Sequence, residues 1–318
     1  METTKIGLGL AAIGRPEYIN LRQEPDPDKS IMSYRNRALE LLDAAYKSGI
    51  RHFDTAPSYG KGEDFLIEWY RKSHVKDAVF STKWGYTYVA NWEIGYQGKH
   101  EIKEHSLGKL NEQWQKSKDL MPALNIYQVH SATFESGVLD NTEVLRRLHE
   151  IKIKHGIKIG MSVSGSDQAR LLDEASTILI EGKPLFDSFQ VSYNILESTT
   201  HQMVGQLLSA GKTIIIKEAL ANGRLLPNSK LPQYNELYQV LTGLGSKYKV
   251  GADAIALRYV MDNLKPTTVL SGASSVIQLN GNLKALGFRI EEKELSQLST
   301  YGMEAQAYWH ERSELKWH

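Results

Sequence analysis

Short apolar runs alternate with longer amphipathic stretches along most of the chain. Runs such as Ile157–Val163 and Thr213–Lys217 are rich in β-branched residues and too short for typical helices, so they predict buried strands. Between the runs, apolar residues recur three or four positions apart, as in Thr142–His155, and this spacing predicts helices. The predicted strands are Ile6–Leu10, Ile50–Asp54, Asp77–Lys83, Ala123–His130, Ile157–Val163, Phe186–Tyr193, Thr213–Lys217 and Thr267–Leu270.

Helical segments separate these eight strands, including predicted helices at Glu101–Lys118 and Asp167–Ile180. Strands that alternate with helices favour a parallel sheet, and eight such units predict a closed (β/α)8 TIM barrel of the α/β class. An open, doubly wound sheet is the alternative architecture. Because no linker or change of composition divides the chain, we expect a single domain over residues 1–318, with 302–318 as a tail or loop over the barrel.

Composition narrows the classes of function. The 38 lysine and arginine residues nearly balance the 37 aspartate and glutamate residues, which argues against a nucleic-acid or anionic membrane partner. The absence of cysteine excludes disulfides and thiolate metal ligands and fits a cytoplasmic protein. No stretch approaches the roughly 20 apolar residues of a membrane span. Metal-ligand spacings such as HExxH are also absent, so we expect no metal site.

Four polar side chains follow neighbouring strands. Asp54, Lys83 and His130 end the second, third and fourth predicted strands, and Tyr59 lies in the loop after the second. Active residues of (β/α)8 barrels lie at the C-terminal ends of the strands and in the loops that follow them. The sequence therefore predicts that these four side chains meet on one rim of the barrel.

Together the four side chains could protonate an alkoxide as it forms from a carbonyl group. A free tyrosine has a pKa of about 10, and a nearby ammonium from Lys83 would make Tyr59 a stronger acid. Asp54 could keep Lys83 charged, while His130 could hold the substrate oxygen against the phenol. A positioned acid is typically worth about 10²–10⁴-fold in rate. Reduction also needs a hydride, which a nicotinamide cofactor supplies.

The glycines of the first strand imitate a dinucleotide-binding fingerprint. Gly7, Gly9 and Ala12 have the spacing of GxGxxG/A. A true fingerprint needs a helix that starts inside it, whereas Pro16 and a polar stretch follow here. We therefore interpret these glycines as part of the first strand and its loop.

Several segments in order resemble the aldo-keto reductase superfamily, over about Ile6 to Leu286. They are GIRHFDTAPSYGKGE (Gly49–Glu63), FSTKWG (Phe80–Gly85), IYQVH (Ile126–His130), FQVSYN (Phe189–Asn194) and SGASSVIQLNGNL (Ser271–Leu283). The resemblance implies an NAD(P)H-dependent oxidoreductase that reduces an aldehyde, ketone or sugar carbonyl to an alcohol, or runs the reverse reaction. It also implies that Tyr59 is the general acid/base, tuned by Lys83 and Asp54, and that His130 orients the substrate.

The resemblance further implies that NADP(H) or NAD(H) lies across the barrel top. Three positions depart from the common pattern: Val163 replaces an asparagine, Lys217 replaces an aromatic residue that stacks on the nicotinamide, and Gln278 stands where one branch has an arginine. These departures leave the preference for NADPH or NADH open. The implied cofactor-binding residues are Ser162, Gln190, Lys217, Leu220, Arg224, Gly272, Ser274, Gln278 and Asn282.

The stretch Trp84–Gly98 is rich in aromatic residues and lacks a helical period. Since it follows Lys83, we expect Trp84 and Tyr86 to wall a pocket for a small-molecule carbonyl or sugar substrate. Two other functions stay open. The departures at Val163 and Lys217 suit a cofactor-binding sensor or regulatory subunit with little turnover, while a metal-dependent barrel lyase or isomerase lacks ligand spacing.

Overall fold

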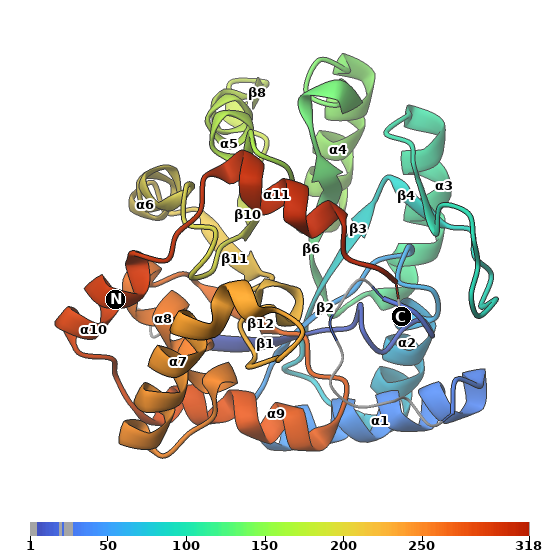
Figure 1. Ribbon diagram of the computed structural model, residues 1–318. Coiled ribbons are helices and arrows are strands. Elements are labelled where there is room, and N and C mark those ends of the chain that lie inside the picture. Colours follow the sequence, from blue (N-terminus) through green and yellow to red (C-terminus); the bar gives the residue numbers. More distant parts are fainter. Residues whose placement is uncertain (1–4, 19–20, 22–27, 318) are drawn as a thin grey trace.

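The computed structural model describes residues 5–18, 21 and 28–317. Eight parallel strands form a closed barrel, so the predicted (β/α)8 architecture is confirmed (Figure 1). The open-sheet alternative is wrong, because β1 pairs with both β12 and β2. The barrel strands are β1 (Lys5–Gly9), β2 (His52–Asp54), β3 (Val79–Trp84), β6 (Leu124–Ala132), β7 (Lys158–Val163), β10 (Ser188–Ser192), β11 (Thr213–Lys217) and β12 (Thr268–Ser271).

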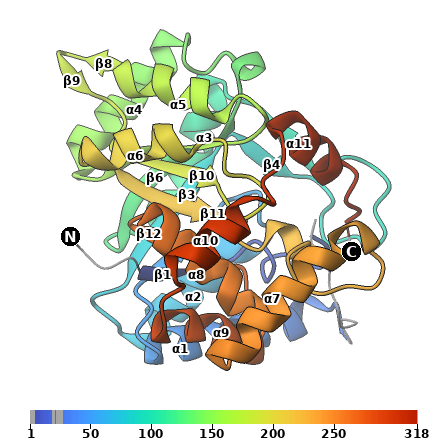
Figure 2. The same cartoon turned by 60° about the vertical axis from the view of Figure 1, so that its left-hand side comes forward.

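Helices surround the strands, and α11, red in Figure 1, crosses in front of them in that view (Figures 1 and 2). None of the helices in the described ranges is both long and apolar enough to span a membrane. The α-helices are α1 (Ile31–Lys47), α2 (Gly62–Ser73), α3 (Leu107–Ser117), α4 (Thr142–His155), α5 (Gln168–Thr177), α6 (His201–Ser209), α7 (Asn235–Tyr248), α8 (Ala252–Leu264), α9 (Val276–Leu283), α10 (Glu292–Ser299) and α11 (Ala305–Ser313). Short 3-10 helices are η1 (Lys118–Leu120), η2 (Phe134–Ser136), η3 (Ala221–Gly223), η4 (Pro232–Tyr234) and η5 (Lys284–Gly287).

Two predicted helices are partly wrong, because small hairpins occupy their ends. The prediction at Glu101–Lys118 starts too early, since β5 (Glu101–Lys103) pairs antiparallel with β4 (Tyr86–Tyr88). The helix begins only after Ser106, whose hydroxyl accepts a hydrogen bond from the Lys109 amide as an N-cap. The prediction at Asp167–Ile180 runs too far, since β8 (Leu179–Ile180) pairs with β9 (Lys183–Pro184).

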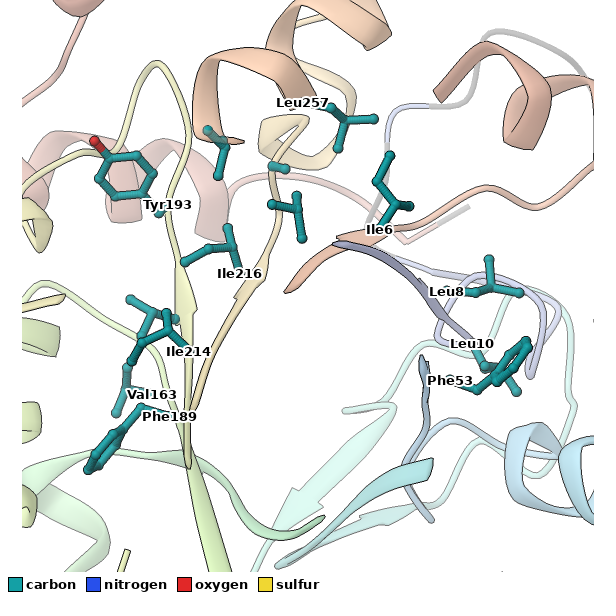
Figure 3. Packing of buried hydrophobic residues seen from close by; sticks show 14 of the residues in the cluster. Ile6, Leu8, Leu10, Phe53, Val163, Phe189, Tyr193, Ile214, Ile216 and Leu257 are labelled. Carbon is teal, nitrogen blue, oxygen red and sulfur yellow. The ribbon is translucent and has the colours of Figure 1, made fainter. Parts of the chain in front are cut away.

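Alternate residues of each strand face opposite sides of the barrel wall. The apolar set, including Leu8, Phe53 and Ile216, belongs to the large buried cluster that unites strands and helices, part of which Figure 3 shows. Fully burying one such side chain contributes roughly 1.5–3 kcal/mol. The other set is mostly polar, apart from a small separate cluster of Ile126, Ile215 and Leu270. This division leaves the inside of the barrel for hydrogen-bonding side chains.

A polar network links several strands inside the barrel. The ring of His52 on β2 contacts the Ser81 hydroxyl at 2.9 Å and the Thr268 hydroxyl at 3.4 Å. Ser81 in turn donates to the Asp54 carboxylate at 2.6 Å. Burial lowers the pKa of His52 to about 4, so its imidazole is neutral at ordinary pH. The network holds β2, β3 and β12 around Asp54.

Glu63 on α2 is a second buried carboxyl group. Its Oε1 accepts hydrogen bonds from the hydroxyls of Thr82 on β3, at 2.6 Å, and Ser117 on α3, at 2.9 Å. Burial raises its pKa to about 7, despite these two bonds. Glu63 forms no salt bridge with any described residue, so its ionisation near neutral pH is not compensated by a cation in contact.

Glu63→Gln should therefore stabilise the protein at alkaline pH, because glutamine keeps the acceptor oxygen and cannot ionise. The pKa of Glu63 is 4.5 in the unfolded chain and about 7 in the folded protein. Between these pH values only the folded protein holds the proton, so the free energy of unfolding falls as pH rises. Near pH 8 the free energy of unfolding of the variant, measured by urea denaturation, should exceed that of the wild type by about 1–3 kcal/mol. Near pH 4.5 the two proteins should be almost equally stable. An equal difference at both pH values would contradict this assignment.

Candidate active site

The turn that carries Tyr59 is fixed by backbone contact with the loop after β1. The Lys61 amide donates to the Gly14 carbonyl oxygen at 2.6 Å. A Cβ atom on Gly14 would lie 2.1 Å from the Tyr59 carbonyl oxygen, so only glycine allows this approach. Gly60, with a φ of +63°, makes the matching turn on the other side. The two loops therefore hold Tyr59 beyond the C-terminal end of β2.

Asp54 and Lys83 form a buried ion pair beneath Tyr59. Lys83 Nζ lies 2.5 Å from Asp54 Oδ2 and donates a second hydrogen bond to the Thr55 carbonyl oxygen at 3.0 Å. The other carboxylate oxygen of Asp54 accepts from Ser81 at 2.6 Å and from Gln190 at 2.9 Å. Burying two charges is costly unless their remaining hydrogen-bonding capacity is also satisfied, and these bonds satisfy it.

The structure brings all four rim residues together. Lys83 Nζ lies 4.7 Å from the centre of the Tyr59 ring, and the ring of His130 lies 5.6 Å from that of Tyr59. Ser58 Oγ is 3.4 Å from His130 Nδ1, and a ring nitrogen of His105 lies 3.0 Å from the His130 carbonyl oxygen. These contacts constrain the imidazole beside the phenol.

The protonation states differ in one respect from the sequence-based prediction. Burial raises the pKa of Tyr59 well above 10, with Asp54 and Glu101 adding to the effect and Arg15 opposing it. The expected lowering by Lys83 is therefore not the net result, because desolvation dominates and Asp54 compensates the ammonium. Burial, followed by the charge of Lys83, also lowers the pKa of His130 well below 6.5. Tyr59 is thus a neutral phenol and His130 a neutral imidazole, and each can donate one hydrogen bond.

A cavity of about 800 Å³ opens above these residues and extends toward α9. It lies within the range typical of small-molecule sites. Tyr59, Asp54 and His130 line its inner part. The predicted cofactor-binding residues that line it are Gln190, Lys217, Leu220, Gly272, Ser274, Gln278 and Asn282.

Two predicted cofactor-binding residues do not line this cavity. Ser162 is fully buried, and its hydroxyl accepts a hydrogen bond from the Ser131 amide at 2.8 Å. Arg224 is also fully buried, with Nη1 3.1 Å from a carboxylate oxygen of Glu311 on α11 and its guanidinium 4.2 Å from the Tyr308 ring centre. The implied contact of Arg224 with the cofactor thus conflicts with this geometry, because the ion pair with Glu311 keeps the side chain inside the protein.

The expected substrate wall is also partly different. Trp84 is fully buried, and its ring packs 5.4 Å from that of His105, so it faces the core and does not line the cavity. Tyr86 is half-buried, and its ring centre lies 4.9 Å from that of His130. Of the two predicted wall residues, only Tyr86 lies beside the rim residues.

Sequence reasoning missed a cluster around Arg15. Arg15 Nη1 donates to the Ser58 carbonyl oxygen at 3.0 Å and pairs with Glu101 at 2.8 Å. Its guanidinium lies 4.9 Å from the ring centre of Tyr18 and 4.6 Å from that of Trp317. Trp317 comes from the C-terminal segment and lines the cavity. No sequence pattern indicates this contact between the two ends of the chain, although Arg15 follows β1 in a loop at the active rim.

A second missed group follows β11. Glu218 lines the cavity with a φ of +56°, and Nε of Arg312 on α11 donates to it at 2.9 Å. Burial tends to raise the pKa of Glu218, but the charges of Arg312 and Lys217 outweigh burial and hold it at about 2. Its place at a strand end is the same signal that identified Asp54 and Lys83. Arg312 anchors α11 to the cavity wall.

The loops at the cavity mouth touch each other. The Leu21 amide, in the loop after β1, donates to the Asn222 carbonyl oxygen, in the loop after β11, at 2.9 Å. Both residues line the cavity. This main-chain hydrogen bond bridges two segments that are about 200 residues apart in sequence.

The polar groups of the cavity fit a nicotinamide dinucleotide. The side-chain nitrogen of Gln190 donates a hydrogen bond to Asp54. The side-chain oxygen of Gln190 can therefore accept a hydrogen bond from a carboxamide. At the other end, Asn282 lines the cavity with its nitrogen donating to Ser271 at 2.8 Å. A Cβ on Gly272 would meet no atom within 4 Å, so a ligand can approach the backbone there. Asp253 adds a carboxylate that can accept from ribose hydroxyls.

Comparison with known proteins agrees with this geometry. The profile of the Aldo/keto reductase family matches residues 5–301. Aldo-keto reductase ausK of Emericella nidulans is 22% identical over 304 residues, covering 84% of this chain and 73% of that protein. The putative aryl-alcohol dehydrogenase AAD14 of Saccharomyces cerevisiae is 23% identical over 302 residues, covering 84% of this chain and 77% of that protein.

Solved structures show the same fold. The aldo-keto reductase AKR11C1 from Bacillus halodurans, in its holo form, superposes with a TM-score of 0.68 at 17% identity, covering 96% of this chain and 94% of that one. A putative aldo-keto reductase from Pseudomonas aeruginosa, PA4992, gives a TM-score of 0.60 at 20% identity, with 94% and 92% covered. The chain therefore belongs to the aldo/keto reductase family, a family of NAD(P)H-dependent oxidoreductases.

Proposed function

We propose that this protein interconverts a small carbonyl compound and its alcohol, with Tyr59 as the general acid and base. The observation that supports this most is the cluster in which Lys83 lies against Tyr59, Asp54 pairs with Lys83 and His130 stands beside the phenol. Three of these residues line one cavity, and the fourth lies directly beneath it. The substrate is an aldehyde, ketone or sugar.

In the direction of reduction, neutral His130 donates a hydrogen bond to the carbonyl oxygen and holds it near the Tyr59 hydroxyl. A bound nicotinamide supplies the hydride. Tyr59 gives its proton to the alkoxide oxygen, and the Lys83 ammonium stabilises the phenolate that remains. Asp54 holds Lys83 in place through the ion pair. The reverse reaction uses the same groups, with the phenolate as the base.

NADP(H) or NAD(H) fits along the rest of the cavity. In this proposal Gln190 binds the carboxamide, the Lys217 stem covers one face of the nicotinamide, and backbone atoms from Leu220 to Gly223 face the phosphates. Gly272, Ser274, Gln278 and Asn282 form the adenosine end. Ser162 supports the Ser131 backbone from behind the cavity and acts indirectly. Because the name of the yeast relative points to aryl alcohols, aryl aldehydes belong in the first substrate panel.

Tyr59→Phe tests the mechanism. The variant keeps the ring but loses the acidic proton, so turnover should fall by about 10²–10⁴-fold with a panel of aryl, alkyl and sugar aldehydes. Nucleotide binding, followed by tryptophan fluorescence, should change by less than about threefold. Undiminished turnover would refute the role of Tyr59. Wild-type protein that binds nucleotide yet turns over no aldehyde of the panel would favour the sensor alternative.

Lys83→Met tests whether the ion pair serves chemistry as well as stability. Removing the lysine leaves the Asp54 carboxylate buried and unpaired, so the free energy of unfolding should fall by about 3–5 kcal/mol. Adding Asp54→Asn removes that charge and should restore at least half of the loss, measured by urea unfolding. Turnover should stay low in the double variant, because the ammonium beside Tyr59 is still missing. Recovery of turnover together with stability would assign the pair a purely structural role.

Trp317→Ala tests the C-terminal wall of the cavity. Trp317 contacts Arg15 and stacks on His100 with ring centres 4.4 Å apart, so it borders the substrate end and not the adenosine end. We expect the KM for aryl aldehydes to rise about tenfold, with nucleotide affinity within about twofold of wild type. Trp309→Ala, on the same segment but absent from the cavity lining, is the matched control. Equal effects of both variants would indicate general loosening of the C-terminal segment.

A further inference from the structure

Lys217 has different surroundings from the other cations of the inner cavity. It ends β11, lines the cavity and forms no salt bridge with any residue the structure describes. Its two hydrogen-bond partners are the hydroxyls of Ser192, at 2.8 Å, and Ser164, at 3.2 Å. Three other cations at or beneath the cavity each face a carboxylate: Lys83 faces Asp54, Arg15 faces Glu101 and Arg312 faces Glu218.

The directions of these hydrogen bonds follow from the serine hydroxyls. Ser192 donates its proton to Glu218 at 3.1 Å, and Ser164 donates its proton to the Ser131 hydroxyl at 3.1 Å. A hydroxyl has one proton to give. Both serine oxygens must therefore accept from Lys217, and together they use two N–H bonds of its nitrogen.

This arrangement suits an uncharged amine. A neutral lysine nitrogen has two N–H bonds and one lone pair, so the two serines satisfy both donors and leave the lone pair available. An ammonium would carry a third N–H, for which the described residues provide no hydrogen-bond acceptor; the centre of the Trp309 ring lies 5.9 Å from the nitrogen. Burial, helped by the charges of Arg312 and Lys83 and opposed by those of Glu218 and Asp54, lowers the pKa of Lys217 to about 8. At pH 7 about a tenth of Lys217 is thus uncharged, far more than for an exposed lysine.

We propose that Lys217 is a carbonyl-reactive lysine that condenses with aldehydes entering the cavity. The nitrogen lone pair attacks the carbonyl carbon, the C=O π bond opens to a hydroxyl, and proton transfer gives a carbinolamine. The hydroxyl then leaves as water together with the one proton that the nitrogen still carries, and the neutral imine forms. The step transfers no electrons and needs no cofactor, so it is independent of the oxidoreductase mechanism proposed above.

The adduct has a consequence for ligand binding. Lys217 lines the same cavity as Gln190 and Leu220, and the nicotinamide is proposed to lie against its stem. An imine at this position places the carbon chain of the aldehyde in that space. The aldehyde adduct and the nucleotide therefore compete for the space beside Lys217. This competition is separate from the reaction of substrate and nicotinamide at Tyr59.

Reductive trapping tests the proposal on the nucleotide-free protein. Propanal and sodium cyanoborohydride convert an imine into a stable secondary amine, which peptide mass spectrometry locates. Near pH 7.5, Lys217 should be labelled at least about tenfold faster than an ordinary exposed lysine, because a larger fraction of it is uncharged. Its rate should level off above about pH 8. The exposed Lys72 and Lys293 serve as internal references, with rates that still rise at that pH.

Lys217→Met provides the matched control. Rapid labelling of the β11 peptide should disappear in this variant. The surface lysines and the α-amine, which lie on other peptides, should react as before. Labelling of Lys217 no faster than that of Lys72, or with the same pH dependence, would overturn the proposal. Rapid labelling without any nucleotide-dependent turnover would instead reject the oxidoreductase mechanism and leave this inference standing.

Discussion

The ion pair between Asp54 and Lys83 is the constraint on which the site depends. Both groups are buried, so each needs the other, and Asp54 also takes hydrogen bonds from Ser81 and Gln190. These bonds tie together β2, β3 and β10. Removing water from this pair strengthens it and also makes it intolerant of change. The polar interior of the barrel can thus be understood as a support for one carboxylate, which in turn fixes one ammonium beneath the phenol.

The barrel and the four rim residues could be predicted from sequence because both depend on local pattern. A buried strand is recognisable from its apolar run, and a polar residue at the end of such a run has a defined place in a (β/α)8 barrel. Asp54, Lys83 and His130 each meet that condition. Glu218 meets it too, directly after β11, but no neighbouring motif drew attention to it.

The remaining features depend on contacts that no local pattern encodes. Arg224 directly follows the loop proposed to face phosphates, yet its side chain is buried in an ion pair with Glu311 on α11. Trp84 ends β3 beside Lys83, yet successive residues of a strand face opposite sides, so it points into the core. The net pKa of Tyr59 depends on burial, which a sequence does not give directly. The hairpins at β4–β5 and β8–β9 pair strands of only two or three residues, whose periodicity is too brief to separate from a helix.

The hydrogen bond between Leu21 and Asn222 would affect the dissociation rate of a long ligand. It joins the two sides of the cavity mouth through a single main-chain hydrogen bond, whose rupture costs roughly 0.5–1.5 kcal/mol in water. Under the proposed function, a dinucleotide bound between Leu21 and Asn222 would be released only after this bond opens, whereas a small aldehyde need not open it. The bond would then lengthen the residence time of the large molecule and leave that of the small one unchanged.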